Sequence, residues 1–353
     1  MWFQALFNVM LNDLYYTLCF DVPIIINEVK MNFNKLLILL FFTLPFYSAA
    51  QSCEKLPPSA NPPKLVSLGN YSIVEGDVND FDFCHSSVRF AMPWGVTKPP
   101  LVILAHGGGG LSRGEIELGR IFLSMGFATL MFDAYKMNDI DKPPLFMSSS
   151  VSLFSKQQML YKITLGSYKW AIKSEKINVN KIFFYGVSNG ATTVANIAAA
   201  VDPLHVKAVF AEGMVGAGLG MPDNLKVPLR LIYGKLDNFG MPNPSDSMWL
   251  RQESCQFNRV FEQPQGTAAN CNQKVNRQLF DIKPIDWYQM QLEKNADIKI
   301  WWLEESAHGI FSGQLNKTTM VSGGRTLFTW TGGPTSDRDK LISQIKNYVA
   351  SLN

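Results

Sequence analysis

Short runs of mostly apolar residues recur along the chain, and most of them end at a glycine or an aspartate. Runs without regular polar alternation are typical of strands that are buried on both faces of a sheet. Residues 86–94 alternate between apolar and polar positions, so we expect a strand near the edge of the sheet there. The apolar runs are 101–105, 128–132, 182–185, 208–211, 229–233 and 298–303.

Helical patterns separate these strands. Positions 118, 121, 122 and 125 form one apolar stripe, and positions 159, 163 and 170 lie on one face of a longer helix. Two further helices are expected over 189–200, which is rich in Ala and Thr, and over about 337–352. This alternation predicts a mostly parallel sheet with helices on both faces, in a single domain over residues 51–353.

One segment interrupts the alternation. About 60 residues separate Asp237 from the strand that begins at Ile298, which is longer than a usual loop with one helix. We interpret residues 238–296, approximately, as a lid-like insertion over the top of the sheet.

Residues 31–50 have the features of a secretory signal peptide. Lys35 supplies a positive charge, residues 36–46 form an apolar run, and Ser48 and Ala50 are small enough for cleavage after residue 50. The run is too short to cross a membrane, which takes about 20 apolar residues. We therefore expect a leader over residues 1–50, a true start near Met31, and an exported mature chain with no integral membrane span. A longer membrane-anchored N-terminus and a lipoprotein modified at Cys53 are the alternatives.

Charge and cysteine content narrow the classes of function. The formal net charge is only +3 and no long run of Lys or Arg occurs, so there is no electrostatic basis for nucleic-acid binding.

Four cysteines follow the leader, and an even number in an exported chain suggests disulfides. Pairing between sequence neighbours gives Cys53–Cys84 and Cys255–Cys271. No Cys or His spacing is typical of zinc, and we expect neither a metal nor an organic cofactor.

The sequence Gly-Val-Ser-Asn-Gly at 186–190 is a G-x-S-x-G motif between a predicted strand and a predicted helix. In that context the motif is typical of a nucleophile elbow, a tight turn that holds the serine in a strained backbone conformation above the sheet. The neighbours of the serine must be small to avoid collision, which accounts for Gly186 and Gly190. We therefore predict that Ser188 is a nucleophile.

A serine nucleophile needs a base and an acid, which follow it in the order acid, then histidine, in this type of fold. His308 follows the strand 298–303 at the carboxyl edge, whereas His205 is expected at the opposite end of the sheet. Asp237 follows the strand 229–233 and is the predicted acid, with Glu212 as the alternative. The predicted triad is Ser188, Asp237 and His308.

The sequence His-Gly-Gly-Gly-Gly at 106–110 follows another predicted strand. Without Cβ atoms, this backbone can approach a substrate closely and direct N–H groups at a developing oxyanion. We predict an oxyanion hole formed by Gly107, Gly108 and Asn189, and a structural, buried role for His106. A phosphate-binding loop is the alternative, but the segment lacks the Lys and Ser/Thr of a P-loop.

With these motifs in place, residues 85–350 resemble the dienelactone hydrolase family of α/β-hydrolases, and most closely its exported members. The resemblance implies an α/β-hydrolase fold, the triad named above, and Gly108 and Asn189 as oxyanion donors. Founding members of that family use a cysteine nucleophile, so Ser188 favours general ester chemistry over lactone specificity. The motifs that carry the resemblance are 106–112, 126–133, 186–190, 234–237 and 307–311.

The sequence therefore predicts an exported serine hydrolase that cleaves small-molecule carboxylic esters or lactones through an acyl-enzyme. A peptidase or amidase with the same triad is the alternative within the enzyme class, and a non-catalytic binding protein on a hydrolase scaffold is the alternative outside it. The physiological substrate and the oligomeric state do not follow from the sequence.

Overall fold

The computed structural model describes residues 64–68, 71–75, 80–140, 153–214, 221–237, 284–322 and 325–352. These residues all belong to one compact unit, Cys53–Asn353. The predicted leader, Cys53, Cys255, Cys271 and residues 238–283 lie outside the described residues, so the signal peptide and both disulfides stay predictions.

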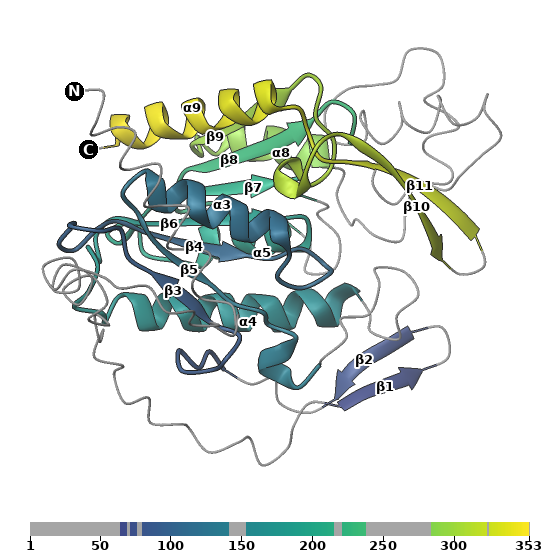
Figure 1. The fold of residues 1–353 in the computed structure, drawn as a ribbon, viewed down its shortest axis with the longest axis horizontal. Coiled ribbons are helices and arrows are strands. Elements are labelled where there is room, and N and C mark those ends of the chain that lie inside the picture. Colours follow the sequence, from purple (N-terminus) through teal and green to yellow (C-terminus); the bar gives the residue numbers. More distant parts are fainter. Residues whose placement is uncertain are drawn as a thin grey trace, which may run out of the picture. The chain divides into compact units, whose positions relative to one another are not determined.

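A seven-stranded sheet forms the centre of this unit, as Figure 1 shows. Six strands are parallel, and only β3 at the edge pairs antiparallel with its neighbour β5. This arrangement confirms the predicted α/β-hydrolase fold. In spatial order the strands are β3 (Arg89–Ala91), β5 (Ala128–Met131), β4 (Leu101–Ala105), β6 (Ile182–Val187), β7 (Val206–Glu212), β8 (Leu229–Gly234) and β9 (Ile298–Leu303).

The strand order reverses direction at β4, because the chain leaves β4 for β5 on one side and then returns to β6 on the other. Open α/β sheets bind ligands at such a switch point, outside the carboxyl ends of the strands. The loop after β4 and the turn after β6 are the two glycine-rich segments that the sequence analysis selected. The topology therefore brings the predicted oxyanion loop and the predicted nucleophile to one edge of the sheet.

Helices cover both faces of the sheet and bury two separate apolar clusters. Alternate residues of β4 belong to opposite clusters, with Ile103 on one face and Leu104 on the other, because side chains alternate along a strand. Helices α3 (Arg113–Ser124) and α9 (Thr335–Ser351) pack on one face. Helices α4 (Leu153–Ala171), α5 (Asn189–Ala200) and α8 (Pro284–Glu293) pack on the other.

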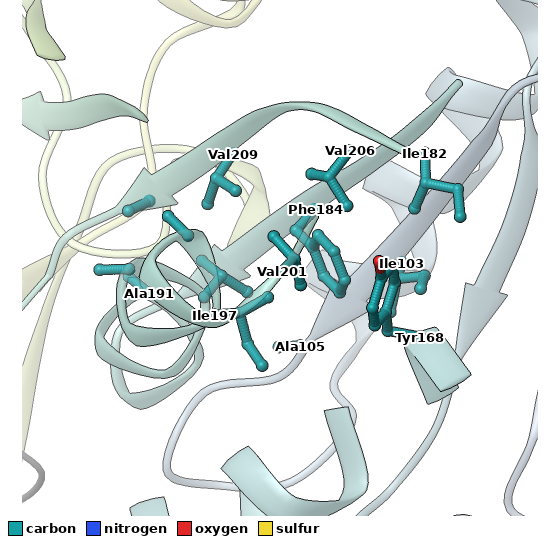
Figure 2. Close-up of a cluster of buried hydrophobic side chains, with 14 of the residues drawn as sticks. Ile103, Ala105, Tyr168, Ile182, Phe184, Ala191, Ile197, Val201, Val206 and Val209 are labelled. Atoms are coloured by element: carbon teal, nitrogen blue, oxygen red, sulfur yellow. The ribbon is translucent and has the colours of Figure 1, made fainter. Parts of the chain in front are cut away.

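Small side chains allow α5 to lie close to the strands that precede and follow it. Figure 2 shows Ala191 and Ile197 of this helix beside Phe184 of β6 and Val209 of β7. Ala191 is fully buried, as are most residues of the helix. The helix that follows Ser188 is therefore a rigid, packed element, which fixes the position of its first residues.

The predicted insertion ends in a helix that belongs to the core. Within 238–296 the structure describes residues 284–296, and these include α8. Trp287 of this helix is 2% exposed, and its indole N–H donates to the carbonyl of Pro222 at 2.7 Å. Residues 284–293 thus form the helix that connects β8 to β9 on one face of the sheet.

Two β-hairpins were not predicted. The first pairs β1 (Lys64–Leu68) with β2 (Tyr71–Glu75), and the second pairs β10 (Asn316–Ser322) with β11 (Arg325–Thr331). Only two residues, Gly-Asn and Gly-Gly, separate the strands of each pair, which is a sequence signal for a tight hairpin. The second hairpin begins eight residues after His308, and Thr331 at its end forms a bridge with that histidine.

Candidate active site

Ser188 occupies a strained turn between β6 and α5. Its φ of 57° and ψ of −113° lie outside the regions that L-residues ordinarily adopt. A Cβ on Gly186 would overlap the Gly190 carbonyl, and a Cβ on Gly190 would overlap the carbonyl of Ala105 on β4. The two glycines are therefore required by close backbone contacts, as the motif predicted, and the turn has the geometry of a nucleophile elbow.

The turn is connected to the neighbouring strand through its main chain. The Ser188 N–H donates to the carbonyl of Glu212, the last residue of β7, at 2.8 Å. The Ser188 side chain is 5% exposed. Gly213 directly follows the end of β7, so the serine turn lies near Gly213 at the carboxyl edge of the sheet.

His308 and Asp237 form a hydrogen-bonded pair at the same edge. Their Nδ1 and Oδ2 atoms are 2.9 Å apart, although 71 positions separate the two residues in the sequence. The pair lies against Gly213, whose φ is +61°: a Cβ there would be 2.9 Å from His308 Nδ1 and 3.4 Å from Asp237 Oδ2. Glu212 is bonded to the serine turn, and the next residue, Gly213, lies against the histidine–aspartate pair. These two consecutive residues therefore connect the two parts of the site.

Burial and charge act in opposite directions on His308. Burial of the imidazole lowers its pKa, because the charged form loses solvation, whereas the carboxylates of Asp237 and Glu212 raise it. The net effect is a His308 pKa above its usual value. The imidazolium is therefore stabilised where it would form if His308 accepted a proton.

Glu212, the alternative acid, has different partners. Its Oε2 accepts from the Tyr185 hydroxyl at 2.6 Å and its Oε1 accepts from the Ile310 N–H at 2.5 Å. The hydrogen bond from the histidine ring goes to Asp237 instead. Burial raises the pKa of Glu212 to about 7, even though both hydrogen bonds and the charge of His308 oppose that rise.

The structure corrects one predicted oxyanion donor. The Gly107 N–H already donates to Oε1 of Glu115, a buried residue of α3, at 3.0 Å, so it is not available to a substrate. The other carboxylate oxygen of Glu115 accepts from the N–H and the hydroxyl of Ser112 in a capping box. Gly108 and Asn189 remain as candidate donors. Asn189 is the first residue of α5, where main-chain N–H groups have no acceptor within the helix.

His106 has the predicted structural role. It is fully buried, and its Nε2 accepts from the Ala134 N–H at 3.0 Å, so Nδ1 carries the hydrogen and donates to the Gly107 carbonyl at 2.7 Å. In a trans peptide the N–H of Gly108 points away from the carbonyl of Gly107. His106 therefore fixes the direction of the Gly108 N–H.

The remaining histidine candidate lies elsewhere. His205 is at the amino end of β7, where its Nδ1 is 3.0 Å from the carbonyl of Val179. Its main-chain carbonyl accepts from the N–H of Ile182, at the start of β6. This position at the opposite end of the sheet agrees with the prediction.

Sequence reasoning missed the hydrogen bonds by which Glu115 and Glu212 support the site, although it had named Glu212 as the alternative acid. Glu115 lies three residues after Ser112, which is the spacing of a capping box, so the start of α3 could have been predicted from the sequence. Its bond to Gly107 spans eight residues and depends on the side-chain conformation. The bond from Ile310 to Glu212 spans 98 residues, and no local pattern indicates it.

Among the residues that the structure describes, no group of three or more Asp, Glu, Cys or His side chains is placed to hold a metal ion. No helix in the described ranges is long and apolar enough to span a membrane.

Comparison with known proteins gives similar solved structures but no family assignment. No family model and no curated protein matches the chain. Dienelactone hydrolase from Anabaena variabilis is 17% identical over 70% of this chain and 89% of that one, with a TM-score of 0.37. A dienelactone hydrolase-like promiscuous phosphotriesterase from metagenomic libraries is 12% identical over 82% of this chain and 98% of its own, with a TM-score of 0.45.

Esterase 2 from Thermogutta terrifontis, phosphoramylated by tabun, is also similar, at 10% identity over 85% of this chain and 98% of that one, with a TM-score of 0.46. Dienelactone hydrolases are thus among the similar structures, as the motifs led us to expect. At these identities and TM-scores the similarities are too remote to assign an activity or a residue's role. The function must be argued from the site itself.

Proposed function

We propose that the mature chain is an exported serine hydrolase that cleaves carboxylic esters or lactones, with Ser188, His308 and Asp237 as its catalytic triad. One observation carries the proposal. A serine in a strained strand-to-helix turn is joined through Glu212 and Gly213 to a buried histidine that is paired with an aspartate, in the chain order that this fold uses.

The proposed reaction has two half-reactions, and in each of them His308 first accepts a proton and then returns it. Ser188 Oγ attacks the carbonyl carbon while His308 Nε2 accepts its proton, and the Asp237 carboxylate stabilises the imidazolium through Nδ1–H. The N–H groups of Gly108 and Asn189 are the proposed donors to the oxyanion. Collapse of the intermediate breaks the bond to the alkoxy oxygen, which leaves with the proton from His308. Water then hydrolyses the acyl-enzyme by the same steps and restores the serine.

The conformation of Ser188 supports a catalytic role over a binding role. A non-glycine residue at positive φ costs on the order of 1–3 kcal/mol and persists only where the surrounding structure enforces it. A binding protein on the same scaffold would gain nothing from that cost. Base catalysis needs a group that can accept a proton, and His308 is buried, bonded to Asp237 and has a pKa above its usual value.

The test combines active-site labelling with turnover. A fluorophosphonate probe should label the wild-type protein at Ser188, mapped by peptide mass spectrometry, and Ser188→Ala should abolish labelling. The same variant should lower ester turnover by on the order of 10⁴-fold or more. Ser124→Ala is the matched control, because Ser124 is an exposed serine at the end of α3, and it should change neither result.

The substrate panel should contain esters of increasing acyl length, a lactone and an anilide. Faster hydrolysis of the anilide than of matched esters would favour a peptidase or amidase instead. Retention of more than a tenth of the activity in Ser188→Ala would disprove the triad. Export is supported by the pattern at 31–50 alone, and N-terminal sequencing of the secreted protein should give Gln51 as the first residue.

A further inference from the structure

The carboxyl group of Glu212 has no task in the reaction proposed above, yet it is among the most buried polar groups of the described chain. The residue is 1% exposed. Burial of a carboxylate is costly unless it is paired or hydrogen-bonded, and Glu212 uses its two oxygens for the hydroxyl of Tyr185 and the N–H of Ile310. Packing alone does not explain why an ionisable carboxyl group is buried at this position.

Glu212 contacts two parts of the candidate site that are far apart in the sequence. Its main-chain carbonyl accepts from the N–H of Ser188, the proposed nucleophile, at 2.8 Å. Its side chain holds the N–H of Ile310, two residues beyond His308, at 2.5 Å. The same residue therefore bonds to the serine turn on one side and to the histidine loop on the other.

We propose that Glu212 is a positioning residue that holds the His308 loop in register with the Ser188 turn and places a second carboxylate beside the His308 imidazole. This inference rests on the proposed function, because it assigns Glu212 a role in the same site. Other bonds also hold the histidine loop, from Gly332 and Trp330 of the β10–β11 segment. Glu212 contributes the bond that connects this loop directly to the strand beside the nucleophile.

The surroundings of Glu212 explain why a carboxylate matters there. The titratable groups that act on it are Tyr185 from β6, through a hydrogen bond, and Glu115 from α3 and His308, through their charges; His308 is itself bonded to Asp237 through Nδ1. Glu115 and burial favour the neutral form of Glu212, whereas Tyr185 and His308 favour the ionised form, and its pKa is about 7. The charge of Glu212 therefore depends on pH around neutrality, and it acts on the imidazole that must lose its proton to serve as a base.

The sign of the effect follows from this geometry. An ionised Glu212 stabilises the imidazolium and raises the pKa of His308. Its removal should therefore lower that pKa and extend base catalysis to lower pH. A residue that only filled space would leave the pH dependence unchanged.

Four variants separate charge from anchoring. Glu212→Gln keeps an oxygen for the Ile310 N–H but carries no charge, whereas Glu212→Ala removes both. Tyr185→Phe removes a donor that favours ionised Glu212, and it leaves the carboxyl group in place. Glu304→Gln is the matched control, because Glu304 lies on the same loop but is exposed and pairs with Lys235 at 2.7 Å.

The first measurement is the dependence of kcat/KM on pH for a simple ester. We expect the acid limb to move by about half a unit to one unit toward lower pH in Glu212→Gln, and by less in the same direction in Tyr185→Phe. We expect Glu212→Ala to lower kcat by about 10- to 100-fold with little change in KM, since misplacement by about 1 Å can cost that much. Glu304→Gln should match the wild type.

The second measurement does not need turnover. The ring protons of His308 can be followed by NMR through a pH titration and assigned by comparison with His308→Ala. The midpoint should be lower in Glu212→Gln than in the wild type and unchanged in Glu304→Gln. If the wild type fails to react with fluorophosphonate, the proposed function is wrong, but this titration still tests the placement of Glu212.

An unchanged His308 midpoint in Glu212→Gln would overturn the inference. So would a Glu212→Ala variant that keeps wild-type kcat while its melting temperature falls, because Glu212 would then be a structural residue only. Melting temperatures of all four variants show whether any loss of kcat comes from unfolding.

Discussion

Gly213 offers the sharpest test of the site geometry, because a single methyl group can be placed against the histidine–aspartate pair. In Gly213→Ala, the new Cβ would be 2.9 Å from His308 Nδ1, whereas ordinary contacts begin at 3.4 Å. The imidazole must therefore move by about 0.5 Å or the main chain must shift by a similar amount. The bond from His308 to Asp237, 2.9 Å long, would lengthen or lose its alignment.

The expected losses follow from these distances. A displacement of about 1 Å at a catalytic group can cost about 10²-fold in rate, so half of that should lower kcat about tenfold. KM should change little, because the pair acts on proton transfer rather than on binding. The positive φ of +61° adds about 1–2 kcal/mol of instability for any L-residue.

A matched control separates the two effects. Gly126 also has a positive φ, +88°, but among the residues that the structure describes no heavy atom of another segment lies within 4 Å of the point that a Cβ would occupy there. Gly126→Ala should therefore lose a similar free energy of unfolding, measured by urea denaturation, and keep the wild-type kcat. The reasoning is refuted if Gly213→Ala retains full kcat, or if both variants lose kcat to the same extent.

Four further predictions concern acids, pH and cysteines. Asp237→Asn should lower turnover about 10³–10⁴-fold, because it favours the wrong His308 tautomer, and stopped ester assays measure this. The kcat/KM of the wild type should rise with pH through an ionisation whose pKa lies above 6.5, the ordinary pKa of a histidine. A flat profile from about pH 5 to 9 would contradict a histidine base. As the pH rises from about 4.5 to 7.5, the wild type should lose stability and Glu212→Gln should not, because only the wild type must ionise a buried carboxyl group. The difference in free energy of unfolding, measured by urea titration, should grow to about 3 kcal/mol in favour of the variant. Replacing Cys255 and Cys271 by Ser should raise KM for bulky esters more than for acetates, and free thiols in non-reducing peptide maps would reject the pair.

The sequence was most informative where burial dictates composition. Strands inside a parallel sheet are covered on both faces, so β4 and β8 were visible as apolar runs with limits within one residue of those observed. The edge strand β3 was predicted over 86–94 but spans only Arg89–Ala91, because exposed flanks carry the same alternating pattern whether or not they pair. The hairpin β10–β11 was missed, although its Gly-Gly step is a hairpin signal.

The site was predictable to the extent that it depends on strand ends. Ser188, Asp237 and His308 all follow parallel strands, so the rule about carboxyl edges brought them together without a structure. Strand ends do not determine which main-chain N–H group remains free to donate to an oxyanion. The occupation of the Gly107 N–H depends on the rotamer of Glu115, and no periodicity or motif determines that choice.

Three carboxylates surround the candidate site, and each fixes a different part. Asp237 holds the imidazole, Glu115 holds the glycine loop, and Glu212 holds the loop that carries His308. For Glu212 this arrangement has a measurable cost. The folded-state pKa is raised from 4.5 to about 7, which corresponds to about 3 kcal/mol of stability that is present below pH 4.5 and lost as the pH rises through 7. A glutamine would avoid that loss and still accept from Ile310. The role proposed above accounts for a glutamate here, because only a carboxylate can stabilise the His308 imidazolium, and the His308 titration in Glu212→Gln tests it.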